Sequence, residues 1–250
     1  MSPRAKVLGC SIDRLGMEET LARVDDVIAS GGYSQHMAIN TAKLVSLRDD
    51  DRLRGIVEGC ELVNADGQAV VWASRLLGDP LPERVAGIDL MEELLGLAEQ
   101  KGYRVYILGA REDVLDQAIA RIRERYPALT IAGWRDGYFS REEEPQVCAS
   151  IRASQPQMVF VAMSTPRKEY FLAERGPELG AEFVMGVGGA VDVIAGLTRR
   201  APISWQRLGL EWLYRLLQEP RRMFRRYAVT NTRFAWMVAL ALAGRRDTGA

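Results

Sequence analysis

The sequence RVYILGA at residues 104–110 indicates the fold class: a run of β-favouring residues ends at Gly109 and Ala110, and helical apolar spacing follows to about Tyr126. A strand, a tight turn and a helix in this order form the repeating unit of nucleotide-binding α/β folds. Outward from it, similar patterns predict strands at residues 5–11, 37–40, 62–64, 130–134, 158–163 and 183–187. Helices are predicted at residues 17–30, 43–59, 89–101 and 141–154, and another begins after Gly67.

This alternation predicts an α/β fold with a doubly wound, mostly parallel sheet and a Rossmann-like core. The opening strand, helix and strand, within residues 5–40, are expected to start that parallel sheet. In such folds ligands bind at the carboxyl ends of the strands. The residues that follow each strand are therefore the first place to look for function.

The pattern changes after Pro202, where helices are predicted at residues 205–218 and 221–243 and no strand is evident. From Arg199 onward there are eleven arginines against three acidic residues, a net charge of +8, in a chain whose 33 basic and 33 acidic residues balance. We therefore divide the chain into an α/β core, residues 1–200, and a helical, basic, amphipathic appendage, residues 201–250. Such asymmetry indicates an anionic partner for the appendage, either phosphate groups or a lipid surface, whereas a nucleic-acid-binding protein is more often basic throughout.

Composition also indicates the compartment. The three cysteines lack metal-ligand spacing, and the first residues resemble a strand rather than a signal peptide, which favours the cytoplasm. No apolar run reaches the ~20 residues that cross a bilayer. The expected location is cytoplasmic, peripheral on a membrane.

Several kinds of chemistry are disfavoured. His36 is the single histidine, which argues against a histidine triad or a multi-histidine metal site, and neither a P-loop motif nor a complete G-x-G-x-x-G is present. Asp49, Asp50 and Asp51 offer the Asp-x-Asp that can hold a metal-bound diphosphate, but a solvated helix face is the favoured interpretation of this stretch. We predict no metal.

Two of four candidate sites follow the strands at residues 37–40 and 62–64. The Asn40 amide, next to Thr41, could bind a sugar hydroxyl, or it could cap the following helix. The Asp66 carboxylate, before Gly67, suits a general base for an acceptor hydroxyl, with helix capping as the alternative.

The other two sites come later in the chain. Residues 164–169 open a helix with Arg167, Lys168 and Glu169 near its positive end, which suits an anionic ligand, although an ordinary surface helix start is the competing interpretation. Residues 186–192 form a glycine-rich turn through Gly188 and Gly189 to Asp192, of a kind that often cradles phosphates or nucleosides.

Seven blocks occur in one order: Asn40; Ala65-Asp66-Gly67; Arg84 with Gly87-Ile88-Asp89; Pro166-x-x-Glu169; Gly186-Val187-Gly188-Gly189-Ala190-x-Asp192; Arg200-Ala201-Pro202; and Glu211-Trp212-Leu213-Tyr214-Arg215. In this order and spacing the chain resembles the WecG/TagA/CpsF family of bacterial glycosyltransferases, from Val7 to Phe234.

The resemblance implies an inverting, metal-independent hexosyltransferase that uses a UDP-sugar, typically UDP-N-acetylmannosamine or its uronic acid, and needs no other cofactor. The implied acceptor is polyprenyl-diphosphate-linked, usually undecaprenyl-diphosphate N-acetylglucosamine, at the inner face of the cytoplasmic membrane, in the synthesis of a cell-surface polysaccharide. The resemblance also implies that the protein can form a homo-oligomer.

By the same resemblance, Asp66 is the catalytic base, Asn40 and Arg84 line the sugar and diphosphate pocket, and Asp192 contacts the uracil end. Arginines of the appendage, Arg215, Arg221 or Arg225, are expected to clamp phosphates. The full predicted substrate-binding set is Asn40, Thr41, Arg84, Lys168, Glu169, Gly188, Gly189, Asp192, Arg215, Arg221 and Arg225.

Two positions depart from the family pattern, which usually has Gln where this chain has Lys168 and Thr where it has Ala38. Lys168 could pair with the carboxylate of a uronic-acid donor, or it could point to solvent. Two other classes of protein stay open at this point. They are a noncatalytic nucleotide-sugar-binding or scaffold subunit of a polysaccharide assembly complex, and, less favoured, a Rossmann-type oxidoreductase.

Overall fold

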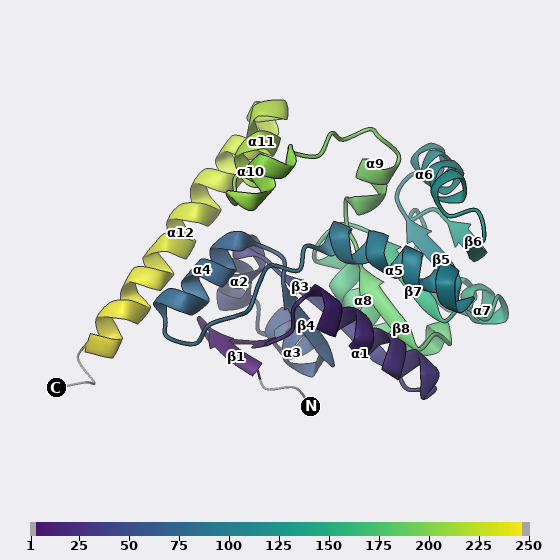
Figure 1. Ribbon diagram of the computed structural model, residues 1–250, viewed down its shortest axis with the longest axis horizontal. Helices are drawn as coiled ribbons and strands as arrows, with labels where there is room; N and C mark the ends of the chain where they lie inside the picture. The colour runs from purple at the N-terminus through teal and green to yellow at the C-terminus, as the bar shows by residue number, and fades with distance from the viewer. Residues whose placement is uncertain (1–3, 247–250) are drawn as a thin grey trace.

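The structure is a computed structural model that describes residues 4–246, apart from the side chains of Arg207, Arg222, Met223, Arg225, Arg226, Arg245 and Arg246. Its centre is a six-stranded sheet in the order β4–β3–β8–β7–β5–β6, with every neighbouring pair parallel (Figure 1). The strands are β3 (Ser34–Ile39), β4 (Leu62–Ala65), β5 (Arg104–Gly109), β6 (Thr130–Arg135), β7 (Met158–Ala162) and β8 (Phe183–Gly186). The predicted α/β fold with a parallel, Rossmann-like sheet is confirmed.

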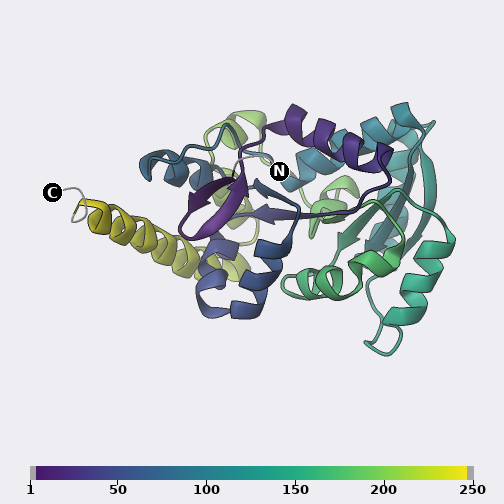
Figure 2. The same cartoon turned by 90° about the horizontal axis from the view of Figure 1, so that it is seen from below.

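Helices cover both faces of this sheet (Figures 1 and 2), because its strands alternate their side chains between two apolar layers. In β5, Val105 and Ile107 face one layer, whereas Tyr106 and Leu108 face the other. The first layer holds α1 (Met17–Ala29), α5 (Gly87–Lys101), α6 (Glu112–Arg125) and α9 (Ala190–Ile194). The second holds α2 (Thr41–Asp49), α3 (Asp51–Gly59), α4 (Gln68–Leu76), α7 (Glu144–Ala153), α8 (Arg167–Arg175) and the 3-10 helix η1 (Gly176–Leu179).

The first strands of the chain do not belong to the parallel sheet, so the expectation that residues 5–11 start it is wrong. They form an antiparallel hairpin of β1 (Arg4–Val7) and β2 (Cys10–Asp13). Leu8 and Gly9 both have positive φ, 52° and 87°, which gives the two-residue turn that reverses the chain. The hairpin is tied to the sheet through Asp13, whose carboxylate accepts from the Val63 backbone N–H at 2.8 Å.

The single helix predicted over residues 43–59 is two helices, because Asp50 interrupts it. Asp50 has an extended backbone, caps α3 by accepting from the Leu53 N–H at 2.8 Å, and accepts from the Tyr170 hydroxyl at 2.7 Å. Asp49 pairs with Arg233 at 2.9 Å. The favoured interpretation of the three aspartates as one solvated helix face is therefore wrong for Asp50, because an Asp side chain at this point satisfies a free helix N–H.

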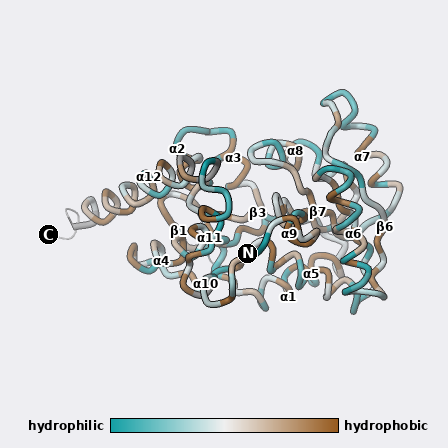
Figure 3. The backbone as a smooth tube through the Cα atoms, turned by 90° about the horizontal axis from the view of Figure 1, so that it is seen from above, coloured by the Kyte–Doolittle hydropathy of each residue, from teal (hydrophilic) through white to brown (hydrophobic). Residues whose placement is uncertain are grey.

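The appendage consists of α10 (Ile203–Arg207), α11 (Glu211–Gln218) and α12 (Pro220–Arg246), whose far end extends away from the sheet (Figure 1). The helix predicted at residues 205–218 is split by Gly209, at φ +65°, which lies so close to Gln68 of α4 that a Cβ there would be 2.9 Å from the Gln68 Cβ. Hydrophobic residues recur along α12 (Figure 3), and three of them are buried against the α2–α4 layer: Phe234, Met237 and Val238. The division of the chain near residue 200 stays a prediction.

In the part of the chain that the structure describes, none of the helices combines the length and the hydropathy that a bilayer crossing requires.

Candidate functional site

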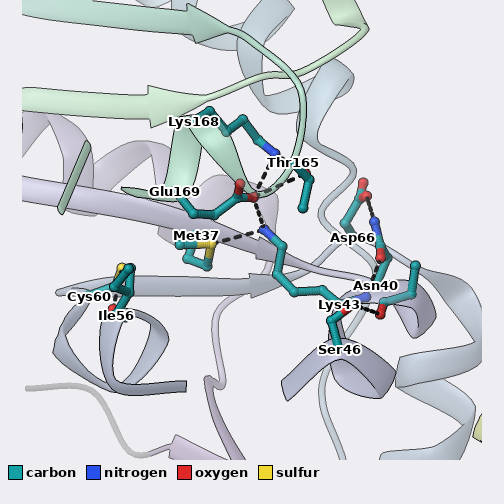
Figure 4. Close-up of polar contacts among 11 residues, drawn as sticks. Met37, Asn40, Lys43, Ser46, Ile56, Cys60, Asp66, Thr165, Lys168 and Glu169 are labelled. Carbon is teal, nitrogen blue, oxygen red and sulfur yellow. Dashed lines mark hydrogen bonds and ion pairs between the residues drawn. The ribbon is translucent and has the colours of Figure 1, made fainter. Parts of the chain in front are cut away.

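Asn40 and Asp66 lie side by side because β3 and β4 end together. The strands pair Ile39 with Ala65, so the next residue of each emerges at the same edge of the sheet. The Asp66 N–H donates to the Ile39 carbonyl at 2.8 Å, and Asn40 Nδ2 donates to Asp66 Oδ2 at 3.4 Å (Figure 4). The amide oxygen of Asn40 accepts from the Lys43 N–H at 3.0 Å. Asn40 is thus the N-cap of α2, as one interpretation predicted, and it also holds the carboxylate of Asp66.

The Asp66 carboxylate does not cap the helix that follows it, so that alternative is wrong. The N-cap of α4 is Gly67, without a side-chain hydrogen bond. Asp66 Oδ1 instead accepts from the Gly87 N–H, at the start of α5, at 2.9 Å. One oxygen is therefore held by a backbone N–H and the other by the Asn40 amide, while the side chain stays half-buried. A carboxylate fixed in this way at a strand end is suited to accept a proton from a bound hydroxyl.

A buried charge cluster lies beside this pair. Glu169, which is 1% exposed, is contacted at Oε1 by Lys168 Nζ at 2.6 Å and by Lys43 Nζ at 2.9 Å (Figure 4). Thr165 Oγ1 donates to the same oxygen at 3.2 Å and also bonds the Lys168 ammonium. Glu169, predicted to bind substrate, therefore has its carboxylate engaged by lysines. Lys43 was not predicted from the sequence, although its place in the first turn of the helix after Asn40 was a usable signal.

The ionisation of this cluster follows from burial. Burial and the nearby charge of Lys43 lower the pKa of Lys168 to about 8, against the opposing attraction of Glu169 and Asp66. Burial alone would raise the pKa of Glu169, but the two ammonium groups hold it below its ordinary value. Lys168 is 8% exposed, so the alternative that it points to solvent is wrong. Its ammonium lies inside the protein, with a carboxylate partner from its own chain.

The lowered pKa of Lys168 predicts a pH-dependent stability. Between pH 8 and the ordinary value of 10.5 the unfolded chain binds this proton more strongly than the folded protein. The contribution of Lys168 to the free energy of unfolding therefore rises with pH across that window. Relative to Lys168→Gln, the wild type should gain roughly 2–3 kcal/mol of unfolding free energy between about pH 7 and about pH 10.5. Urea titrations of both proteins across the window measure this difference, and a constant difference would show that Lys168 keeps its ordinary pKa.

The glycine-rich turn after β8 brings the core and the appendage together. Gly188 has φ +53° and open space where a Cβ would stand. A Cβ on Gly189 would lie 3.6 Å from Arg215 Nη2 and 3.7 Å from Asp192 Oδ2. Asp192 of α9 and Arg215 of α11, both predicted to bind substrate, therefore lie on either side of this glycine-rich turn. The open backbone and a nearby guanidinium suit a phosphate-bearing ligand.

Arg84 contacts the appendage in a second place. Its Nη1 donates to Glu211 Oε2 at 2.9 Å, and its Nη2 lies 3.7 Å from Asp89 Oδ2. Arg200 pairs with the same Asp89 and lies 3.7 Å from Glu211 Oε1. Two arginines therefore bridge the carboxylates of Asp89 in α5 and Glu211 in α11. Sequence reasoning grouped these four residues only as family motifs and did not predict that they contact one another.

Three predicted site residues remain: Thr41, Arg221 and Arg225. Thr41 begins α2 next to Asn40. Arg221 is an exposed residue in the first turn of α12, and the side chain of Arg225 lies outside the described residues.

His36 is fully buried and bonded to Asn64 at 3.1 Å, and burial lowers its pKa to about 3, so it is neutral. Over the described residues, no group of three or more His, Cys, Asp or Glu is placed to hold a metal ion.

A cavity of about 280 Å³ opens between α3, α8 and the start of α7. Its lining residues are Arg52, Arg141, Glu144, Pro166, Arg167, Tyr170, Phe171 and Glu174. Arg52 and Arg141 already pair with Glu174, and Asp66 is not part of the lining. The cavity is therefore separate from the Asn40–Asp66 pair.

The fold and the site define an α/β protein of the Rossmann-like kind, with its polar residues gathered at the carboxyl ends of parallel strands. Residues 5–248 match the glycosyl transferase WecG/TagA/CpsF family, and the chain belongs to that family. That family is one of glycosyl transferases, which act on a sugar donor and an acceptor.

The chain is also similar to a solved structure, a substrate-binding periplasmic protein from Ralstonia solanacearum. The identity is 18% over 76% of this chain, with a TM-score of 0.31, and the chain spans 57% of that protein. So distant a likeness supports no conclusion about activity.

Proposed function

We propose that the protein transfers N-acetylmannosamine, its uronic acid or a related uronic acid from a UDP-sugar to a polyprenyl-diphosphate-linked sugar, without a metal and with inversion. Family membership over residues 5–248 supports sugar transfer in general. The observation that carries the finer proposal is the Asp66 carboxylate, oriented by Asn40 and by the Gly87 N–H at the carboxyl ends of β3 and β4.

The proposed reaction is a single displacement. Asp66 accepts the proton of the acceptor hydroxyl while the hydroxyl oxygen forms a bond to the anomeric carbon of the donor sugar. The bond from that carbon to the phosphate oxygen breaks, and UDP leaves with the electron pair. Attack from the face opposite to the leaving group inverts the anomeric centre. General-base assistance of this kind contributes typically ~10²–10⁴-fold to the rate.

The proposed donor pocket runs from Asn40 and Thr41 across the strand ends to the glycine-rich turn. Gly188 and Gly189 leave the backbone open there, with Arg215 beside them, which suits the diphosphate. Asp192 is proposed to contact the uracil end. Arg84 is proposed to bind the diphosphate as well, in competition with its present partner Glu211.

The proposed acceptor lies at a membrane, and the appendage carries side chains suited to that surface. Exposed large apolar residues lie on its three helices and just after α10: Ile203, Leu208, Trp212, Leu217, Phe224, Val229, Trp236 and Leu240. Arg221 and Arg233, on the same long helix as the last four, are exposed cations. Aromatic and basic residues together favour an anionic lipid interface.

We predict that Phe224→Ser combined with Trp236→Ser lowers the affinity for vesicles containing anionic lipid at least tenfold. These side chains are 66% and 64% exposed, and burial of each in the interface is worth about 1.5–3 kcal/mol. Tyr138→Ser, at a residue 74% exposed and far along the chain from the appendage, is the matched control and should leave vesicle binding unchanged. Equal binding of the double variant and the wild type in co-sedimentation would contradict a membrane role for this surface.

The test of the proposed function is sugar transfer from a panel of UDP-sugars, neutral and uronic, to a synthetic polyprenyl-diphosphate N-acetylglucosamine in the presence of EDTA. Transfer that survives EDTA supports the proposal, and the preferred donor decides whether Lys168 selects a uronic acid. Better use of neutral sugars would reject the uronic-acid alternative. UDP binding with no transfer from any donor would instead favour a noncatalytic nucleotide-sugar-binding subunit.

A further inference from the structure

The buried cluster of Lys43, Lys168 and Glu169 is electrostatically unusual. Two cations and a hydroxyl converge on one oxygen, Glu169 Oε1, while Oε2 is buried without a hydrogen-bond partner in the structure. Buried ion pairs of this kind often add little net stability, because their attraction is offset by the loss of hydration. A gain in stability therefore does not explain why the cluster is present. Its location in the site indicates a functional role instead.

The cluster spans the strand ends beside the proposed base. Lys43 belongs to α2, which follows β3, and Glu169 belongs to α8, which follows β7; β8 lies between these two strands. Gly186, at the end of β8, leaves room for the cluster, since a Cβ there would lie 3.0 Å from Lys168 Cδ. The Lys43–Glu169 ion pair thus ties the α2 end of the site to the α8 end.

Lys43 is held at both of its ends. Its backbone N–H donates to Asn40 Oδ1 at 3.0 Å, and its ammonium contacts Glu169 Oε1 at 2.9 Å and Met37 Sδ at 3.0 Å. Asn40 in turn donates to Asp66 Oδ2 at 3.4 Å, near the long limit of a hydrogen bond. A small shift in the first turn of α2 would break this contact. Figure 4 shows this series of contacts, from Glu169 through Lys43 and Asn40 to Asp66.

We propose that Lys43, anchored by Glu169, is a positioning residue that holds Asn40, and through it Asp66, in the orientation that accepts the acceptor proton. The inference rests on the proposed role of Asp66 as the base. Lys43 touches neither reacting group and acts through its hold on the first turn of α2. Loss of its ammonium should slow the chemical step rather than weaken donor binding, since misplacement of a reacting group by about 1 Å can cost ~10²-fold in rate.

The test is a double-mutant cycle between Lys43→Met and Asp66→Asn. The rate of sugar transfer is measured for each protein at varied concentrations of donor and of acceptor. In the wild-type background Lys43→Met should lower kcat about 10- to 100-fold and change KM for the donor less than about threefold. In the Asp66→Asn background the same change should cost less than about twofold, because no base remains to be positioned. Lys101→Met, at a lysine paired on the surface with Asp25, is the matched control and should behave as wild type.

An equal loss in both backgrounds, or a loss confined to KM, would overturn the proposal. Lys43→Gln serves as a second variant if Lys43→Met does not fold. A crystal structure of the folded variant supplies a readout without turnover: the Asn40–Asp66 contact should open beyond ~3.5 Å. If the wild type transfers no sugar, the proposed function fails. The Asn40–Asp66 distance in the Lys43 variant then tests the positioning role by itself, and an unchanged distance would overturn that role.

Discussion

Replacement of Asp66 by Asn is expected to lower kcat for sugar transfer about 10³-fold, the largest effect on activity of any single change considered. Asn has nearly the same shape, and its amide oxygen can still accept from the Gly87 N–H, which the Asp66 carboxylate binds at 2.9 Å. The variant should therefore fold and bind donor normally. It loses the long hydrogen bond from Asn40 Nδ2 and the basic oxygen that takes the acceptor proton.

Steady-state kinetics and UDP calorimetry separate these effects. We expect the Kd for UDP to stay within about twofold of wild type while kcat falls, because the loss concerns only the transition state. Asp116→Asn, at a surface aspartate that accepts from the Trp134 indole, is the control and should retain full activity. Retention of more than about a tenth of the wild-type kcat by Asp66→Asn would assign the base to another residue.

Replacement of Glu169 by Gln is expected to reduce the free energy of unfolding by about 3–5 kcal/mol at neutral pH, the largest stability effect considered. Glu169 is 1% exposed and is contacted by both Lys43 and Lys168. The neutral amide would leave two buried ammonium groups without an adjacent opposite charge. Removal of one member of a buried charge cluster is costly for this reason, even where the intact cluster contributes little.

Chemical denaturation measures this change, and the same helix supplies a matched control. Glu174 of α8 also pairs with two cations, Arg52 and Arg141, but its side chain is 33% exposed. Water and salt screen that cluster, so Glu174→Gln should cost less than about 1 kcal/mol. Equal costs at the two glutamates would mean that burial does not govern the energetics of the Glu169 cluster.

Much of the fold could be predicted because the parallel strands are short apolar runs that end in polar or glycine residues. The run at residues 104–110 is β5 with its turn, as expected. Errors arose where one or two residues altered the chain direction, as at Leu8 and Gly9, at Asp50 and at Gly209. At Leu8 and Gly9 two consecutive positive φ angles make a hairpin, and strand propensity in residues 5–11 does not distinguish a hairpin from one strand. At Asp50, a capping side chain divides a stretch whose apolar spacing suggests one helix.

The candidate site could be predicted only in part, because sequence order identifies strand ends but not the contacts across them. The positions of Asn40 and Asp66 followed from the strand pattern, and the register of β3 against β4 brings the two residues together. The partners of Arg84 and Glu169 could not be predicted, since Glu211 and Lys43 are each more than a hundred residues away along the chain. Such long-range ion pairs depend on how helices pack over the strand ends.

We propose that this chain moves a sugar from a UDP donor to a polyprenyl-diphosphate-linked acceptor, with Asp66 as the base. This proposal is tested most directly by mass spectrometry of the lipid product after wild type and Asp66→Asn are incubated with UDP-N-acetylmannosamine or its uronic acid, acceptor and EDTA. The wild type should form a product one sugar residue heavier, and the variant should form it about 10³-fold more slowly. A wild type that binds UDP but leaves the acceptor unchanged with either donor, or equal rates for the two proteins, would contradict the proposal.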